Sequence, residues 1–259
     1  MKEILNESEY ESRALLPFVT YTDQATHAPV FSEKAANFML QYKELRMRYA
    51  CALKEVRTKF EVLSTEFGIR YDRNPIAGIS TRLKSSSGIA EKMKKRGVEF
   101  TLESMEKNIF DIAGVRVICS YTDDIYMLAD ALKSQEDITL IAEKDYIKSP
   151  KPNGYRSLHL IVSVPVFFAD RKKDINVEVQ IRTIAMDFWA SLEHEIKYKK
   201  AISDSEDISA RLKACADSIS QIEEEMQNIR KQLEENARPL SDSELLIKKL
   251  QSLDTPLVH

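Results

Sequence analysis

Cationic and aromatic side chains are mixed within one short stretch, Asp145–His159, that lies between two apolar runs. Two prolines restrict its backbone, and Asn153-Gly154 is typical of a tight turn. The lysines and Arg156 repel one another unless an anion lies among them, and the ring of Tyr155 could stack on a base. The stretch is therefore interpreted as a nucleotide-binding loop between two strands, with a solvated cationic hairpin as the alternative.

Two isolated carboxylates, Asp111 and Glu178, occur where strands could present them. Asp111 comes shortly before the β-branched run Val115–Cys119, which predicts a buried strand. Glu178 and Gln180 alternate with valine and isoleucine in Val177–Arg182, so they share the polar face of a strand. Because Mg²⁺ prefers carboxylate oxygens, the pair predicts a magnesium site among bound phosphates. A solvated sheet face is the alternative for the second strand.

Any bound phosphate would have to be held by side chains, because the sequence contains no P-loop or Rossmann motif and only 6 glycines. The cationic candidates are Arg82, Lys84, Lys92, Arg116, Lys144, Lys148, Lys151 and Arg156. The sequence also lacks the zinc and nucleophile motifs HExxH, CxxC and GxSxG, and His159 and His194 are interpreted as structural hydrogen-bonding residues. Together with the carboxylate pair, these features predict a phosphoryl-type site.

The elements that must position these side chains follow from the spacing of apolar residues. Helices are expected over residues 33–67, from about Ile89, from Asp123 to about Lys133 and over 183–200. Strands are expected at 115–119, 138–141, 158–168 and 177–182, with Arg82 and Lys84 on an extended segment. The β-α-β order within 115–141 would by itself favour a parallel sheet.

The two ends of the chain differ from this central part. Residues 1–32 are weakly patterned and are predicted to form an irregular N-terminal arm with at most one short helix. In the tail, apolar residues from Ile208 to Leu233 alternate spacings of four and three, which predicts a helix with a heptad seam. Pro239 should stop that helix, and a last short helix is expected from Ser241. The seam must be buried, either in an oligomer or in an intramolecular hairpin.

Composition restricts the class of protein. Charged residues make up 31% of the chain but nearly cancel to a formal net charge of -3, so no global field attracts nucleic acid or an anionic membrane. The three cysteines lie far apart, which argues against a zinc site or a disulfide framework and fits a reducing cytoplasm. The N-terminus is polar and no apolar run is long enough to cross a bilayer. We therefore expect a soluble, cytoplasmic protein.

Four segments of the chain together resemble one known domain. The segments are TRLKSSSGIAEK, DIAGVRV, DYIKSPKPNGYRSLH and VEVQIRTIAMDFWASLEHEIKYK. Over residues 38–200 the chain resembles the synthetase domain of the RelA/SpoT enzymes, in the form found in single-domain small alarmone synthetases. The resemblance implies an α+β fold, a nucleotidyltransferase-like mixed and mostly antiparallel sheet flanked by helices, with helical N- and C-terminal extensions. It also implies a synthetase domain over 33–200 and a helical oligomerisation segment over 201–259.

The activity implied by this resemblance is that of a GTP diphosphokinase of the stringent response. Such enzymes transfer the β,γ-pyrophosphate of ATP to the 3′-hydroxyl of GDP or GTP, giving ppGpp or pppGpp and AMP. No hydrolase segment with an adjacent His-Asp pair precedes the synthetase region, so synthesis without hydrolysis is expected. Two alternatives stay open. Pyrophosphate transfer to the 3′ end of tRNA is weakly disfavoured by the net charge of -3, and a non-catalytic assembly or binding protein is disfavoured by the intact pair Asp111 and Glu178.

The resemblance further implies a role for each matched residue on the donor side. Arg82 and Arg116 would sandwich the adenine of ATP, while Lys84 and Lys92 would bind its phosphates. The chain departs from the family pattern at Gly88, where a serine hydroxyl is common.

On the acceptor side the resemblance implies that Tyr155 stacks on the guanine. The residues around the acceptor nucleotide would be Lys151, Asn153, Tyr155 and His159. Asp111 would hold Mg²⁺, Glu178 would complete the metal site or activate the 3′-hydroxyl, and Gln180 would support the same face. The family further implies a homo-oligomer, commonly a tetramer, with an alarmone or single-stranded RNA as possible regulators and with no DNA or membrane partner.

Overall fold

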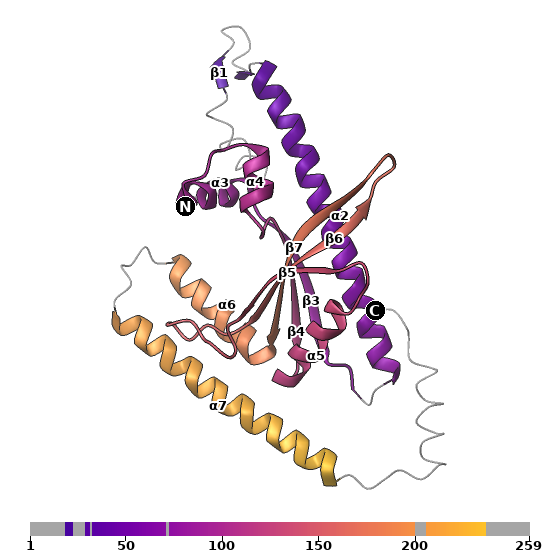
Figure 1. The fold of residues 1–259 in the computed structure, drawn as a ribbon. Helices are drawn as coiled ribbons and strands as arrows, with labels where there is room; N and C mark the ends of the chain where they lie inside the picture. Colours follow the sequence, from indigo (N-terminus) through magenta and orange to yellow (C-terminus); the bar gives the residue numbers. More distant parts are fainter. Residues whose placement is uncertain (1–18, 23–28, 32, 71–72, 200–205, 237–259) are drawn as a thin grey trace. The chain divides into compact units, whose positions relative to one another are not determined.

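The structure is a computed structural model that describes residues 19–22, 29–31, 33–70, 73–199 and 206–236 (Figure 1). Its contacts divide the chain into two compact units. The first unit comprises Met1–Val56, Thr81–Val115 and Ile161–Glu178, and the second comprises Arg57–Ser80, Arg116–Leu160 and Val179–His259.

A mixed five-stranded sheet forms the centre of the fold, in the order β3-β4-β7-β6-β5. Its strands are β3 (Ile76–Leu83), β4 (Ala113–Cys119), β5 (Thr139–Asp145), β6 (Leu158–Phe167) and β7 (Lys172–Thr183). β6 and β7 are joined by a tight turn in which the Phe168 amide donates to the Arg171 carbonyl at 2.8 Å. Because β7 and β6 lie between β4 and β5, the predicted β-α-β unit does not form a parallel pair of neighbours. Local order along the chain cannot show that two later strands insert between them.

The three central strands alternate strictly between buried and half-buried positions. β4 and β6 bury every second residue, as does β7 from Ile175 to Ile181. The buried positions are mostly valine, isoleucine and leucine, which suit a pleated, packed face. The half-buried positions of β4 and β7 include Arg116, Glu178 and Gln180. The apolar-polar alternation read from the sequence is thus confirmed, and it places these polar side chains on one open face of their strands.

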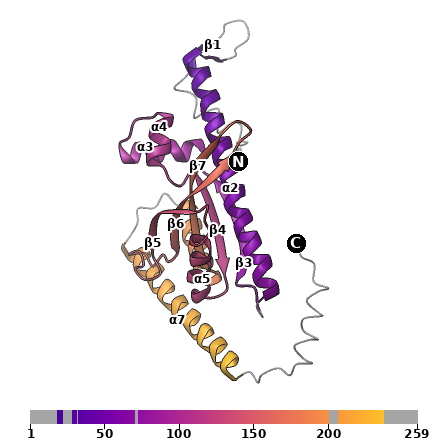
Figure 2. The same ribbon diagram turned by 45° about the vertical axis from the view of Figure 1, so that its right-hand side comes forward.

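Helices α2, α3 and α4 provide most of the helical part of the first unit. The predicted amphipathic helix is confirmed as α2 (Glu33–Arg70), whose apolar stripe is buried at Leu45, Ala52 and Val56 within this unit. Ser85 caps α3 (Ser86–Arg96) by accepting a hydrogen bond from the Gly88 amide, and Gly97 ends it in the left-handed conformation with φ 65°. α4 (Leu102–Asn108) contacts α3 (Figure 2).

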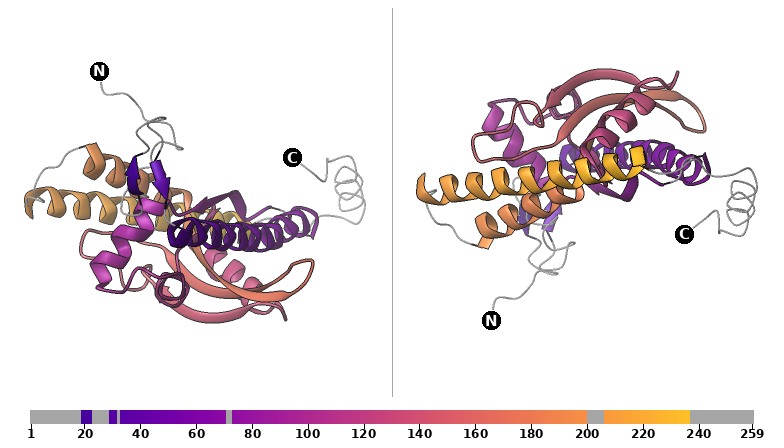
Figure 3. Two further views of the ribbon diagram at one scale, coloured as in Figure 1. Left: turned by 90° about the horizontal axis from the view of Figure 1, so that it is seen from above. Right: turned by 90° about the horizontal axis from the view of Figure 1, so that it is seen from below.

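The second unit contains the C-terminal part of α2, together with α5 (Thr122–Lys133), α6 (Ile184–Lys199) and α7 (Glu206–Asn236). α6 and α7 lie side by side in both views of Figure 3. Trp189 and Ala190 of α6 pack against Ala216 of α7, with Leu212 and Ile219 alongside. We call this group the α6–α7 cluster. It confirms one long helix over the predicted seam, but of the seam residues only Leu212 and Ile219 pack in this cluster, while Cys215 is exposed and Ala216 is buried instead.

The N-terminal arm differs from its prediction where it is described. β1 (Val19–Thr22) and β2 (Pro29–Phe31) form an antiparallel pair instead of an irregular segment or a helix. Period-two pairing over so few residues gives too weak a sequence signal to predict. The expected short helix from Ser241 lies outside the described residues. Among the described helices none is long and apolar enough to cross a membrane.

Candidate active site

Within the first unit, two lysines converge on the carboxylate of Asp111. Lys84 follows β3, Lys92 lies on α3, and Asp111 precedes β4. Their ammonium groups lie 3.1 Å and 2.7 Å from the same oxygen, Oδ2 of Asp111. The Lys84 amide also donates to the Ile112 carbonyl at 2.8 Å, which fixes the backbone of one lysine beside the carboxylate. We call Lys84, Lys92 and Asp111 the Asp111 cluster.

The second oxygen of Asp111 is in a different state. Oδ1 is buried and has no hydrogen-bond partner, although the lysines hold Oδ2. Burial by itself would raise the pKa of Asp111, but the hydrogen bonds and positive charges of Lys92 and Lys84 outweigh it and hold the pKa below its usual range. The carboxylate is therefore ionised at neutral pH, with one oxygen available to a cation.

The arrangement around Gly114 brings two further predicted residues to neighbouring strands. A Cβ added to Gly114 would lie 3.7 Å from the Arg82 carbonyl oxygen and 4.0 Å from the Glu178 carbonyl oxygen. Arg82 of β3 and Glu178 of β7 thus lie beside Gly114 of β4, which is three residues after Asp111 in the chain. The first unit therefore contains Arg82, Glu178 and the Asp111 cluster, which sequence analysis had taken from three separate segments.

Gly88, the departure from the family pattern, lies in the first turn of α3. A Cβ at this position would lie 3.1 Å from the Ser85 hydroxyl and 3.5 Å from the Lys84 side chain. The Ser85 and Ser87 hydroxyls are 3.1 Å apart, and the Tyr42 hydroxyl contacts Ser86 at 2.9 Å. Serine hydroxyls therefore surround this helix N-terminus without a side chain at residue 88.

Within the second unit, the ring of Tyr155 lies in a group of cationic and aromatic side chains. The Arg182 guanidinium donates to the Tyr155 hydroxyl at 2.6 Å, and the same hydroxyl lies 2.8 Å from Nε2 of His159. The Lys151 ammonium is 4.7 Å from the centres of both the Tyr155 and Tyr146 rings. We call Tyr146, Lys151, Tyr155, His159 and Arg182 the Tyr155 cluster. It holds the ring in one orientation, as a stacking platform requires.

The loop that carries Tyr155 is closed by its own hydrogen bonds. Asp145 Oδ1 accepts from the amides of Ile147 and Lys148 at 2.9 Å and 3.0 Å. Burial would raise the pKa of Asp145, but these amide bonds and the hydroxyl of Tyr126 keep it below the usual range. Asn153 donates to Glu193 of α6 at 3.0 Å. The loop is therefore an ordered hairpin, and the predicted residues Lys151, Asn153, Tyr155 and His159 lie on it or at its end.

Arg182 and Asp187 were missed by sequence analysis. The Arg182 side chain is only 5% exposed and donates to Gln180 at 2.8 Å as well as to Tyr155. Oδ1 of Asp187 pairs with Arg182 at 3.2 Å and with Arg116 at 3.3 Å. Strand alternation groups Arg182 with Glu178 and Gln180 on the polar face, but it did not indicate that Arg182 contacts Tyr155. Nothing in the spacing indicated Asp187, which comes from the first turn of α6.

Arg156 does not join a phosphate-binding group, although it was a cationic candidate. Its guanidinium contacts Ser220 and Glu223 of α7 at 2.6 Å and 3.3 Å. Lys148 is largely exposed and pairs with Asp145 at 3.6 Å. Of the cationic candidates, the structure thus separates Lys84, Lys92 and Lys151, which belong to the Asp111 and Tyr155 clusters, from Lys148 and Arg156, which hold the loop itself.

The donor set allows a magnesium ion but does not form a complete cage. Among the described residues, no group of three or more histidine, cysteine, aspartate or glutamate side chains is placed to hold a metal. Mg²⁺ is usually bound by one or two carboxylates, with water and substrate phosphates completing its shell. The partnerless buried oxygen of Asp111 fits that role, with Glu178 as the second carboxylate.

Known proteins are similar to this chain over about three quarters of its length. A family model described as "Region found in RelA / SpoT proteins" matches residues 81–203, which include both clusters. GTP pyrophosphokinase YwaC of Bacillus subtilis is 43% identical over 196 residues, covering 76% of this chain and 93% of that protein. Small alarmone synthetase 1 from Bacillus subtilis bound to its product pppGpp has a TM-score of 0.70 and 34% identity over 74% of this chain and 98% of that one. The same enzyme bound to AMPCPP has a TM-score of 0.65 and 32% identity, over 75% of this chain and 98% of that one.

Proposed function

The chain belongs to the RelA/SpoT family, among its small alarmone synthetases, and on that basis we propose that it transfers the β,γ-pyrophosphate of ATP to the 3′-hydroxyl of GDP or GTP. The products are ppGpp or pppGpp and AMP. The observation that carries the proposal is the Asp111 cluster, an ionised carboxylate with one oxygen held by Lys84 and Lys92 and the other without a partner. A binding or assembly module has no need of such a group.

ATP is assigned to the residues around Asp111. Its phosphates would compete with the carboxylate for Lys84 and Lys92, which lie 3.1 Å and 2.7 Å from Oδ2 and are 19% and 31% exposed. Arg82 and Arg116 are assigned to the adenine, and Asp187 restrains the Arg116 guanidinium at 3.3 Å. A related synthetase has been solved with AMPCPP bound, which supports a nucleotide triphosphate site of this kind.

Mg²⁺ would be held by Asp111 and Glu178. When bound, it would neutralise charge on the transferred pyrophosphate and fix its orientation. Asp111 Oδ1 is oriented for this ligand because Lys84 and Lys92 hold the other oxygen of the same carboxylate. The lysines also leave positive charge beside the oxygens on which negative charge develops.

The guanine nucleotide is assigned to the Tyr155 cluster, with the ring of Tyr155 against the base. Lys151 supplies positive charge beside that ring, at 4.7 Å from its centre. In the reaction the acceptor 3′-oxygen bonds to the β-phosphorus of ATP, and the bond from that phosphorus to the α,β-bridging oxygen breaks. AMP leaves with the bridging oxygen, and the hydroxyl proton passes to the carboxylate of Glu178. Gln180, two residues along β7, is assigned to orient the acceptor.

Transfer of label from ATP tests the reaction directly. The purified protein is incubated with γ-labelled ATP, Mg²⁺ and one acceptor, which is GDP, GTP or uncharged tRNA. Label is expected on the guanine nucleotide and not on tRNA, and omission of Mg²⁺ should abolish the transfer. Labelled tRNA would favour the alternative substrate, and the absence of transfer to every acceptor would favour the non-catalytic alternative.

A homo-oligomer is proposed from the uncovered part of the helical seam, and the family resemblance favours a tetramer. Ile222, Met226, Ile229 and Leu233 of α7 are 64%, 54%, 43% and 68% exposed. An apolar stripe of four large side chains on a long helix is normally buried against another helix. Of the predicted seam, Leu212 and Ile219 pack against α6, so an intramolecular hairpin accounts for only part of it.

Light scattering tests the assembly. The wild type should scatter above 29.7 kDa, and Ile222→Glu with Met226→Glu should reduce it to a folded species of that mass. Gln221→Glu with Asn228→Glu adds the same charge to exposed polar positions of α7 and should leave the assembly intact. A monomeric wild type at micromolar concentration would refute the proposal.

A further inference from the structure

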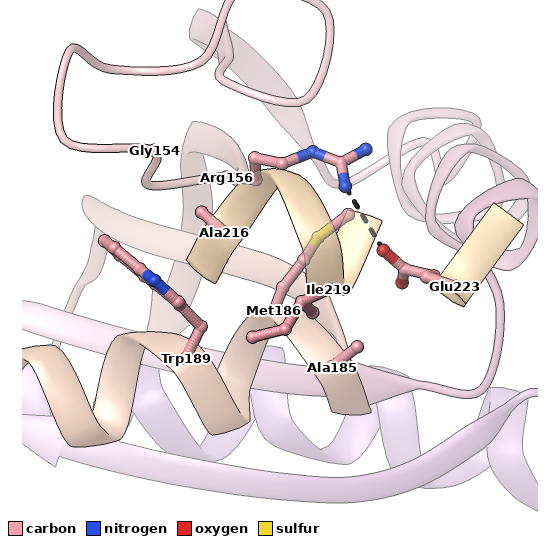
Figure 4. A pocket seen from close by; sticks show the side chains of 8 residues that line it. All are labelled: Gly154, Arg156, Ala185, Met186, Trp189, Ala216, Ile219 and Glu223. Atoms are coloured by element: carbon pink, nitrogen blue, oxygen red, sulfur yellow. Dashed lines mark hydrogen bonds and ion pairs between the residues drawn. The ribbon is translucent and has the colours of Figure 1, made fainter. Parts of the chain in front are cut away.

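The residues on either side of Tyr155 are both held by helix α7. On one side, Arg156 contacts the Ser220 hydroxyl at 2.6 Å. It also contacts the Glu223 carboxylate at 3.3 Å (Figure 4). The Arg156 side chain is 18% exposed and that of Glu223 only 6%, so water competes little for this pair. Burial raises the pKa of Glu223, while the hydrogen bond to Thr183 and the charge and hydrogen bond of Arg156 oppose that shift.

On the other side, the backbone at Gly154 lies directly on α7. Its φ is 90°, and a Cβ at this position would lie 2.5 Å from the Ala216 Cβ and 3.3 Å from the Lys213 Cα. Only a residue without a side chain fits so close to the helix. Ala216 is itself buried in the α6–α7 cluster, against which the ring of Tyr155 also packs.

The docking of α7 is in turn fixed by α6. The indole nitrogen of Trp189 donates to the Leu212 carbonyl at 3.0 Å, and Trp189 lines the small pocket shown in Figure 4 together with Gly154, Arg156 and Glu223. The loop and both helices therefore form one packed group within the second unit. A change in the position of α7 cannot leave the backbone around Tyr155 unchanged, because packed groups transmit displacement.

We infer that α7 positions the acceptor nucleotide: Ser220 and Glu223 act through Arg156, and Ala216 acts through Gly154, to hold the ring of Tyr155 against the guanine. The inference rests on the proposed function of the Tyr155 cluster. It makes Ser220 and Glu223 positioning residues, which touch neither substrate nor the reacting atoms. Because the same helix carries the exposed apolar stripe, the helix proposed for assembly also orders the acceptor site.

The alternative is that Arg156 is a phosphate ligand of the acceptor and that α7 merely sequesters it. The two readings predict opposite effects when the anchor is removed. If α7 positions the loop, loss of Ser220 and Glu223 weakens acceptor binding, since the loop must then be ordered at the expense of binding energy. If α7 sequesters a ligand, the same loss strengthens acceptor binding.

The test is the double variant Ser220→Ala with Glu223→Ala in the full-length protein. The KM for GDP and the Kd for GDP measured by calorimetry should both rise about tenfold, while the KM for ATP stays within a factor of about two. The matched control is Ser218→Ala with Glu225→Ala, which removes the same groups from exposed positions of α7 and should change neither constant. Light scattering and thermal unfolding accompany each variant.

Three results would overturn the inference. They are an unchanged acceptor KM, a lowered acceptor KM, and an equal rise in the KM for ATP. If the double variant does not fold, Ser220→Ala alone decides the matter, because it removes one hydroxyl and should still raise the acceptor KM by about threefold. A wild-type protein that binds no guanine nucleotide would refute the proposed function itself. If the wild type binds GDP and the double variant binds it equally well, only the positioning role of α7 is refuted.

Discussion

Gly154→Ala is the substitution whose effect the structure defines most closely. At φ 90° a side chain is strained, which costs roughly 1–3 kcal/mol. The added methyl would also lie 2.5 Å from the Ala216 Cβ and 3.3 Å from the Lys213 Cα, and neither the methyl of a buried alanine nor a helix backbone can turn away. Overpacking of this kind costs roughly a further 1–3 kcal/mol, so the native loop conformation loses roughly 2–6 kcal/mol.

This cost should be relieved locally. Loops open at lower free energy than a whole domain unfolds, so the loop carrying Tyr155 should leave α7 while the sheet stays folded. The acceptor KM should then rise by at least about tenfold, the factor that corresponds to about 1.4 kcal/mol, with the KM for ATP nearly unchanged. Initial rates measured against varied GDP at saturating ATP, and the reverse, give the two constants.

Gly97→Ala is the matched control. Gly97 also has a positive φ, 65°, but no atom lies within 4 Å of an added Cβ, so the substitution carries the conformational cost without the clash. It should lower the free energy of unfolding by about 1 kcal/mol and leave both KM values unchanged. If Gly154→Ala behaved like Gly97→Ala, with a normal acceptor KM, the contact between the loop and α7 would not matter for acceptor binding.

Three further predictions concern individual side chains. Glu178→Gln keeps the shape of the residue but removes its charge, so turnover should fall by about two or more orders of magnitude with an unchanged melting temperature, and near-normal synthesis would reject Glu178 as base and metal ligand. Tyr155→Phe keeps the stacking ring but removes the hydroxyl that lies 2.6 Å from Arg182 and 2.8 Å from His159. Tyr155→Ala should weaken acceptor binding, and Tyr155→Phe should restore only part of the loss; full restoration would mean that the hydroxyl is not needed. Burial and the hydrogen bond to Asp145 raise the pKa of Tyr126 from 10.0 to about 12, so the stability contributed by this pair is fully present below pH 10 and lost as the pH rises through 12. The ultraviolet titration component that disappears in Tyr126→Phe should have that midpoint, and Asp145→Asn should lower it.

Much of this protein could be predicted from the spacing of its residues. Apolar residues recur at intervals of three and four residues in 33–67 and 208–233. This spacing specifies two long helices, because a helix places residues so spaced on one stripe. The alternation around Glu178 specifies a strand with one polar face, and β7 has that form. The family resemblance could also be seen in the sequence, because each of its motifs is one contiguous segment.

What only the tertiary structure decided was which charged group pairs with which. The sequence contains many cations of similar type, and nothing in their spacing distinguishes Lys84 and Lys92, which hold Asp111, from Arg156, which holds Glu223. Strand order is a further example, because β7 and β6 insert between strands that precede them in the chain. Periodicity reports the local geometry of one element, whereas these pairings depend on groups tens of residues apart that meet only when the elements pack.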